Sequence, residues 1–188
     1  MWWLNEIKES PACESTNCPC GYSEFTITGT VKCLKFIGVH MLKSALTFCR
    51  VDHGGYLPLP LNDQENDEYF NAFITLNLDT FINYDYDIQN QGKGVALDLV
   101  RDGDDFVRFS NKEQVLFFNW NAESSEPDNG WDPYYEEFWG EEHVAMLTSL
   151  PESTPNEEMK LGTWNDFSEY EDMNVVCESD SWVIDLES

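Results

Sequence analysis

The chain has 188 residues, of which 41% are hydrophobic and 14% aromatic, and its 36 acidic and 10 basic residues give a formal net charge of −26. This composition predicts one folded domain and excludes a disordered acidic tail, because such tails contain few aromatic residues. No stretch of sequence approaches the roughly 20 apolar residues that cross a bilayer, and the charge opposes binding to anionic lipid or to nucleic acid phosphates.

The negative charge increases along the chain. Residues 1–60 are neutral overall, residues 61–120 carry −8, and residues 121–188 carry −18. We therefore predict one domain over residues 1–188, with a sheet-rich scaffold in residues 1–120 and an acidic, aromatic-rich part in residues 121–188. A charge asymmetry of this kind favours a surface that meets a positively charged partner.

In the first part of the chain, alternating apolar residues predict strands. Residues 25–31 form the first such pattern, and Gly29 predicts a bulge or bend, after which residues 31–37 continue the strand or pair back on it. Residues 40–51 fit a short helix followed by a strand. Residues 69–78 alternate again and predict a further strand.

The rest of the chain contains more strand patterns and one partial helical pattern. Residues 95–100 and 106–109 flank an acidic turn and predict a hairpin, and residues 115–120 predict another strand. Residues 134–150 carry a partial helical stripe, and residues 174–177 begin a final strand pair or a strand and a tail. The predicted fold class is α+β: a single domain dominated by an antiparallel β-sheet, with one or two short helices.

The cysteines near the start of the chain allow three chemical states. Cys13, Cys18 and Cys20 lie close together and Cys33 follows, so four thiolates could hold a structural zinc, although Cys-Pro-Cys is an unusual spacing for one. Disulfides are the second state and free thiols the third. Because the sequence from Met1 onward lacks the basic and apolar regions of a signal peptide, we expect free thiols, no cofactor apart from the zinc option, and a cytoplasmic protein.

No pattern in the sequence predicts catalysis. A nucleophilic enzyme pairs Cys or Ser with His, but His40, His53 and His143 lie far apart and outside any catalytic motif. Carboxylates are too abundant for one pair to be identified as a general acid and base, and the acidic clusters lack the Gly and distal Glu of an EF-hand. We therefore expect no enzyme, and a hydrolase that uses His53 is the weakest alternative.

Residues 131–142 interleave large aromatic residues with acids, and residues 164–172 repeat this texture. Trp and Tyr anchors supply much of the binding energy of protein interfaces, while carboxylates orient a basic partner. The competing interpretation is that the rings face the core and the acids face water. The predicted partner-binding residues are Asp128, Trp131, Asp132, Tyr134, Tyr135, Glu136, Glu137, Trp139, Glu141, Glu142, Trp164, Asp166, Glu169 and Tyr170.

These features favour an acidic inhibitory binding protein that neutralises a basic, nucleic-acid-targeting protein. It would be a toxin immunity protein (an antitoxin) or a nucleic acid mimic whose carboxylates take the place of phosphates. The alternative is an extracellular or surface β-domain that binds carbohydrate or calcium and has its cysteines in disulfides. The oxidation state of the cysteines distinguishes the two hypotheses, since free thiols favour the first and disulfides the second.

Overall fold

The computed structural model describes residues 17–51, 54–76, 78, 94–122, 126–127, 141–148 and 160–181. Its elements, in chain order, are β1 (Ser23–Ile27), β2 (Thr30–Met41), α1 (Leu42–Val51), α2 (Asp63–Thr75), β3 (Gly94–Asp102), β4 (Asp105–Val107), β5 (Glu141–Leu147), β6 (Trp164–Ser168) and β7 (Asp172–Asp180).

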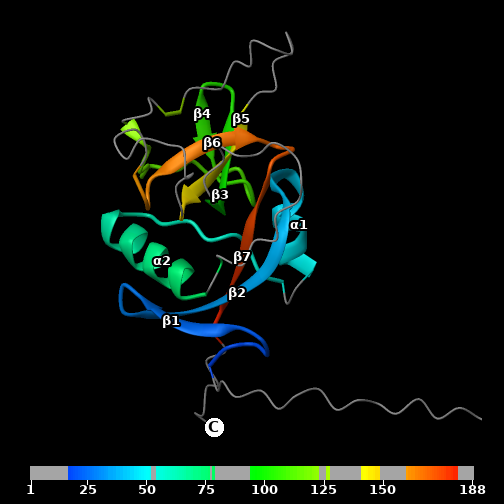
Figure 1. Cartoon of the computed structure of the whole chain (residues 1–188), viewed down its shortest axis with the longest axis vertical. Helices are drawn as coiled ribbons and strands as arrows, with labels where there is room; N and C mark the ends of the chain where they lie inside the picture. Colours follow the sequence, from blue (N-terminus) through cyan, green and yellow to red (C-terminus); the bar gives the residue numbers. More distant parts are fainter. Residues whose placement is uncertain are drawn as a thin grey trace, which may run out of the picture.

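The strands form one seven-stranded sheet in the order β1–β2–β7–β3–β5–β6, with β4 paired to β3 outside this path. Every strand pair is antiparallel except β3 with β7, which is parallel. Figure 1 shows α1 and α2 on opposite sides of the long strands β2 and β7, while β3 to β6 gather at the end of the molecule away from β1. The predicted α+β domain with a largely antiparallel sheet is confirmed.

The first hairpin forms where the sequence places Gly29. Thr28 and Gly29 both adopt positive φ angles of 47° and 78°, so the chain turns tightly and β2 pairs back on β1. Two consecutive positive φ angles are typical of the hairpin turn that matches the twist of the strands. Of the two predictions for residues 31–37, pairing back is the one confirmed.

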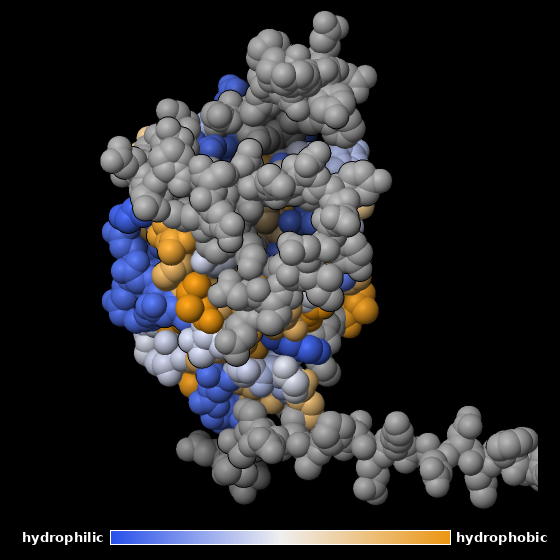
Figure 2. Space-filling model, viewed as in Figure 1, coloured by the Kyte–Doolittle hydropathy of each residue, from blue (hydrophilic) through white to orange (hydrophobic). Residues whose placement is uncertain are grey.

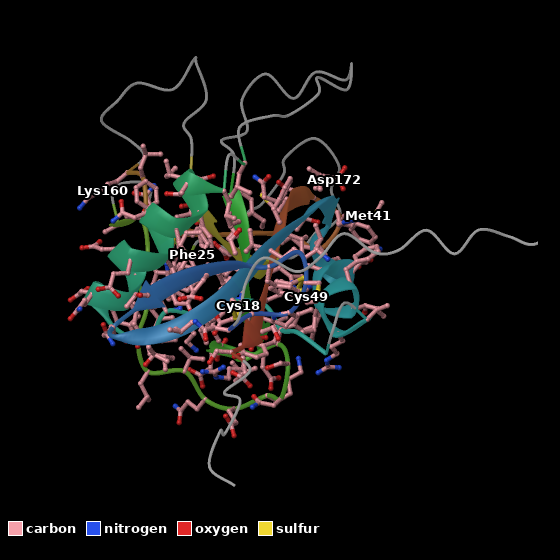
Figure 3. All side chains as sticks on the ribbon, turned by 90° about the horizontal axis from the view of Figure 1, so that it is seen from below. Cys18, Phe25, Met41, Cys49, Lys160 and Asp172 are labelled. Atoms are coloured by element: carbon pink, nitrogen blue, oxygen red, sulfur yellow. A yellow bond between two sulfur atoms is a disulfide. The ribbon has the colours of Figure 1, made fainter. Side chains whose placement is uncertain are left out.

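Helix α1 begins where β2 ends, and Met41 at this junction lies beside its register partner Asp172 (Figure 3). Its buried residues recur every three or four positions, which turns one face toward the sheet: Leu42, Ala45, Leu46 and Cys49. Residues 40–51 therefore contain the predicted helix, but the strand predicted to follow within them is wrong because the helix continues to Val51.

Helix α2 replaces the strand predicted for residues 69–78. The Asn62 side chain caps it by accepting a hydrogen bond from the backbone N–H of Glu65 at 2.9 Å. Tyr69 and Phe73 lie four positions apart and are buried, whereas Ile74 is 47% exposed. The alternation in sequence thus joins residues from different faces of a helix, and Figure 2 shows hydrophilic residues along its outer side.

Two further predictions in the second half are wrong. Residues 141–147 belong to the predicted helical stripe but form strand β5. This strand lies between β3 and β6 and is buried from His143 to Leu147, so its sequence lacks the alternation of apolar and polar residues that identifies a strand with one exposed face. Residues 115–120 are extended but pair only through an isolated bridge of Trp120 with Trp164. The hairpin of β3 with β4 is confirmed, and so is a strand at residues 174–177, within β7.

The cysteines are oxidised. Cys18 is bonded to Cys33, Cys49 of α1 is bonded to Cys177 of β7, and Cys20 also belongs to a disulfide. Among the cysteines of the described segments none is free. The prediction of free thiols is wrong, and a zinc site that uses Cys18 and Cys33 is excluded because neither sulfur is a thiolate. Cys13 lies outside the described residues.

The disulfide between α1 and β7 closes a much longer loop than the one between Cys18 and Cys33, with sequence separations of 128 and 15. Loop-closure entropy predicts a loss of about 5 kcal/mol of unfolding free energy for C49A/C177A and about 3 kcal/mol for C18A/C33A. Urea unfolding of both double variants measures this difference. An equal or larger loss for C18A/C33A would contradict the assignment of Cys49–Cys177 as the main covalent constraint.

Candidate functional site

The site is built around Trp164 at the start of β6. This side chain has no exposed surface, and its indole N–H donates to Oδ1 of Asn66 in α2 at 2.7 Å. The backbone N–H of Trp164 donates to the carbonyl of Asn119, and its carbonyl accepts from the backbone N–H of Asn121. Trp164 therefore joins α2, β6 and the irregular segment 115–122.

Polar residues follow this anchor directly. The side-chain amide of Asn165 donates to Oε1 of Glu126 at 2.8 Å, and the backbone N–H of Glu126 donates to the carbonyl of Asn121. Asp166 is the next residue of β6 and is 2% exposed. We refer to Glu126, Asn165 and Asp166 together as the β6 acidic site.

The oxygens of the β6 acidic site are held away from water. Glu126 Oε2, Asn165 Oδ1 and Asp166 Oδ1 are all buried, and among the described residues no donor reaches Asn165 Oδ1. A buried acceptor without a donor is costly, so in a native fold such an atom is satisfied by a water, an ion or a ligand. Within the described residues no three His, Cys, Asp or Glu side chains lie together as a metal site. The β6 acidic site has two carboxylates, and its third member is the amide of Asn165.

The chemistry of this donor set suits a hard cation. Two carboxylates and one amide carbonyl offer only oxygen, which Ca²⁺ prefers and which zinc and copper sites seldom use alone. The buried side-chain oxygen of Asn165 could serve as one of the ligands of such an ion. The helix predicted for residues 134–150 is wrong over residues 141–147, which form β5 and pair with β6 through Ala145 and Asn165, while residues 134–140 and 149–150 lie outside the described residues.

The structure separates the predicted partner-binding residues into three groups. Trp164 and Asp166 are buried, so neither presents the surface that a protein partner would contact. Glu142, Glu169 and Tyr170 are wholly or partly exposed, and Glu141 belongs to β5. The others lie outside the described residues: Asp128, Trp131, Asp132, Tyr134, Tyr135, Glu136, Glu137 and Trp139.

Glu169 and Tyr170 occupy the turn between β6 and β7, away from the β6 acidic site along the strand. Lys43 lies over the Tyr170 ring at 3.5 Å from its centroid and 3.8 Å from a carboxylate oxygen of Glu169. The turn also accepts the backbone N–H groups of Leu42 and Lys43. Glu169 and Tyr170 therefore belong to a turn that caps the first turn of α1.

Sequence reasoning selected Asp166 but neither Glu126 nor Asn165. The available signal was two consecutive polar residues directly after a strand Trp that enters the core. Such a pair must be satisfied in the interior or bind something there. Glu126 lies some 40 residues earlier in the chain, and only the fold brings it to Asn165.

Solved structures share this architecture. The mouse scavenger receptor C-type lectin carbohydrate-recognition domain has a TM-score of 0.58 and 19% identity, covering 87% of this chain and 98% of that chain. The chain has the C-type lectin-like fold. The C-type lectin CEL-I from Cucumaria echinata gives 0.57 and 17%, covering 86% and 96% respectively.

A third similar structure was determined in the presence of a glycan. The cow C-type carbohydrate-recognition domain of CD23, determined in the presence of a GlcNAc2Man3 oligosaccharide, has a TM-score of 0.55 and 22% identity, covering 87% of this chain and 95% of that chain. No protein-family model matches the sequence, and no match to a curated protein sequence was found.

These findings correct the functional predictions made from charge. A domain with the fold of carbohydrate-recognition domains and oxidised cysteines is not the expected acidic inhibitor, whether immunity protein, antitoxin or nucleic acid mimic. The prediction of a basic, nucleic-acid-targeting partner is wrong for the same reason. The predicted cytoplasmic location is also wrong, because disulfides of this kind persist in oxidising surroundings. In the described part of the chain, no helix is long and apolar enough to cross a membrane.

One buried histidine lies on β5 beside the site strand. His143 is 5% exposed, and its ring packs edge-on against that of Phe109 with centroids 4.8 Å apart. Burial lowers the pKa of His143 from 6.5 to about 4, while Glu169 raises it and Lys112 lowers it to a lesser extent. The folded protein therefore keeps this imidazole neutral.

Because the folded pKa of His143 is depressed, the unfolded chain binds a proton there at a higher pH than the folded chain does. The wild type should lose up to about 1.4 kcal/mol of unfolding free energy per pH unit as pH falls from about 6.5 to 4. H143F should lack this component, since Phe fills the site without titrating. Urea unfolding at several pH values gives the difference, and parallel pH profiles for the two proteins would contradict it.

Proposed function

We propose that the protein is an extracellular or cell-surface carbohydrate-binding domain that binds its ligand through calcium held at the β6 acidic site, and that it is not an enzyme. The observation that carries the proposal is the buried, unfilled acceptor of Asn165 against the Glu126 carboxylate. The solved carbohydrate-recognition domains of the same fold support the class of ligand.

Glu126, Asn165 and Asp166 would hold the cation. Ca²⁺ takes six to eight oxygen ligands, more than these side chains supply, so a bound ion has positions open to the hydroxyl groups of a sugar. The residues themselves keep their carboxylates fixed, because Asn165 donates to Glu126 and Trp164 anchors the strand. A rigid set of oxygens limits the reorganisation that binding would otherwise require.

Two partly buried aromatic residues precede Asn121 in the chain and pack against the core. The half-buried rings of Phe118 and Trp120 stack with centroids 5.7 Å apart and an interplanar angle of 8°. Trp120 precedes Asn121, which is hydrogen-bonded through its backbone to both Trp164 and Glu126. Aromatic faces pack well against the C–H faces of sugars, so partly exposed rings in this segment would favour carbohydrate over a small anion as ligand.

A glycan array tests the proposal with the full, oxidised chain. The wild type should bind a subset of glycans in millimolar calcium and lose that binding in EDTA. N165A and E126Q should weaken glycan binding by about tenfold or more, because each removes an oxygen ligand or its charge. E113Q is the matched control, since Glu113 is exposed and the change in charge is the same as in E126Q.

Calcium binding is measured on the same proteins by the shift in Tm on adding CaCl2. A stabilising shift in the wild type and E113Q that is absent from N165A and E126Q supports the site. Glycan binding that survives EDTA and both variants would contradict the calcium role. Absence of binding to every glycan, together with absence of a calcium-induced shift, would overturn the proposed function.

A further inference from the structure

A positive charge is paired with one acid of the β6 acidic site, Asp166. Arg101, near the end of β3, places Nη2 at 2.5 Å from Oδ2 of Asp166. The Asp166 side chain has no exposed surface and that of Arg101 is 18% exposed. The guanidinium carbon also lies 4.6 Å from the centroid of the Phe106 ring. Arg101 is thus fixed against the site by a hydrogen-bonded ion pair and an aromatic face.

This ion pair has two opposite consequences for a cation. A buried carboxylate needs a countercharge, and Arg101 supplies one when no metal is bound, which holds the Asp166 side chain in place. The guanidinium cannot lose its proton, so its charge remains when a metal enters. It then repels the divalent ion across a few ångströms of poorly solvated protein.

We infer that Arg101 is a built-in cation that stabilises the calcium-free site and sets a low affinity for calcium there. The inference rests on the proposed function. Within that function, Arg101 would regulate the site, because calcium and Arg101 would compete for the carboxylate of Asp166. The oxygens stay assembled without metal, and loading requires the high calcium concentrations at which weak extracellular modules operate.

Replacing Arg101 by Gln separates the two consequences. In EDTA, R101Q should have a lower Tm than the wild type, because the Asp166 carboxylate loses its countercharge. In calcium the ion should restore that charge, so the calcium-induced rise in Tm should be larger in R101Q than in the wild type. Isothermal titration with CaCl2 should show about tenfold tighter binding by R101Q.

The sheet offers a matched control. Arg108 Nη1 lies 3.7 Å from Oδ2 of Asp98, and the two side chains are 26% and 0% exposed. R108Q changes the net charge by the same amount and also breaks an ion pair to a buried carboxylate, but at a different acid. Its calcium affinity should equal that of the wild type. R101K, which keeps the charge, should bind calcium within about threefold of the wild type.

The outcomes distinguish this inference from the function on which it rests. Tighter calcium binding by R101Q, with R108Q equal to the wild type and R101K within about threefold of it, supports Arg101 as the competing cation. A wild type that binds calcium while R101Q binds with equal or lower affinity overturns the inference and leaves the proposed site standing. No calcium binding by the wild type or by R101Q overturns both. If R101Q is unfolded in EDTA, refolding on addition of CaCl2 supports the inference, and failure to refold overturns it.

Discussion

The burial of Trp164 is the constraint on which the rest of this end of the molecule depends. A Trp side chain with no exposed surface must satisfy its indole N–H in the interior, and Asn66 of α2 provides the acceptor. Asn66 in turn donates to the carbonyl of Gly162, which also accepts from the side chain of Asn119. One side chain therefore holds a helix, a strand and an irregular segment together. It also fixes the positions of Asn165 and Asp166, which follow it in β6.

Three of the positive charges of this acidic chain pair with buried acids. Lys32 pairs with Glu178 at 2.7 Å, and Glu178 also accepts from Tyr69 of α2 and from Tyr56. Arg101 and Arg108 each face a carboxylate with no exposed surface. Three of the 10 bases thus neutralise buried acids, which reduces the desolvation cost of those carboxylates.

Sequence reasoning succeeded where one local rule decides the structure. Gly29 has to adopt a positive φ in a tight turn, and the first hairpin formed there. It failed where tertiary contacts select the outcome: residues 69–78 alternate in hydrophobicity, yet the Asn62 cap and the core contacts of Tyr69 and Phe73 favour a helix. Strand β5 is buried on both faces, so it carries no alternation to detect.

The functional prediction failed for a different physical reason. Net charge is a property of the whole surface and identifies no partner, whereas a cation site needs only a few oxygens in one place. Asn165 and Glu126 meet across a chain separation of 39 residues, and nothing in local spacing records that contact. The oxidation state of the cysteines also depends on which pairs the fold brings together, as with Cys49 and Cys177.

In the proposed site, the side-chain carbonyl of Asn165 faces a bound calcium ion beside Glu126. This is tested most directly by following the NMR signal of the Asn165 side-chain amide, identified by its loss in N165A, during a titration with CaCl2. Calcium bound there should cause a saturable shift of this signal that EDTA reverses. A signal that stays unmoved through the titration, while the protein remains folded and oxidised, would contradict it.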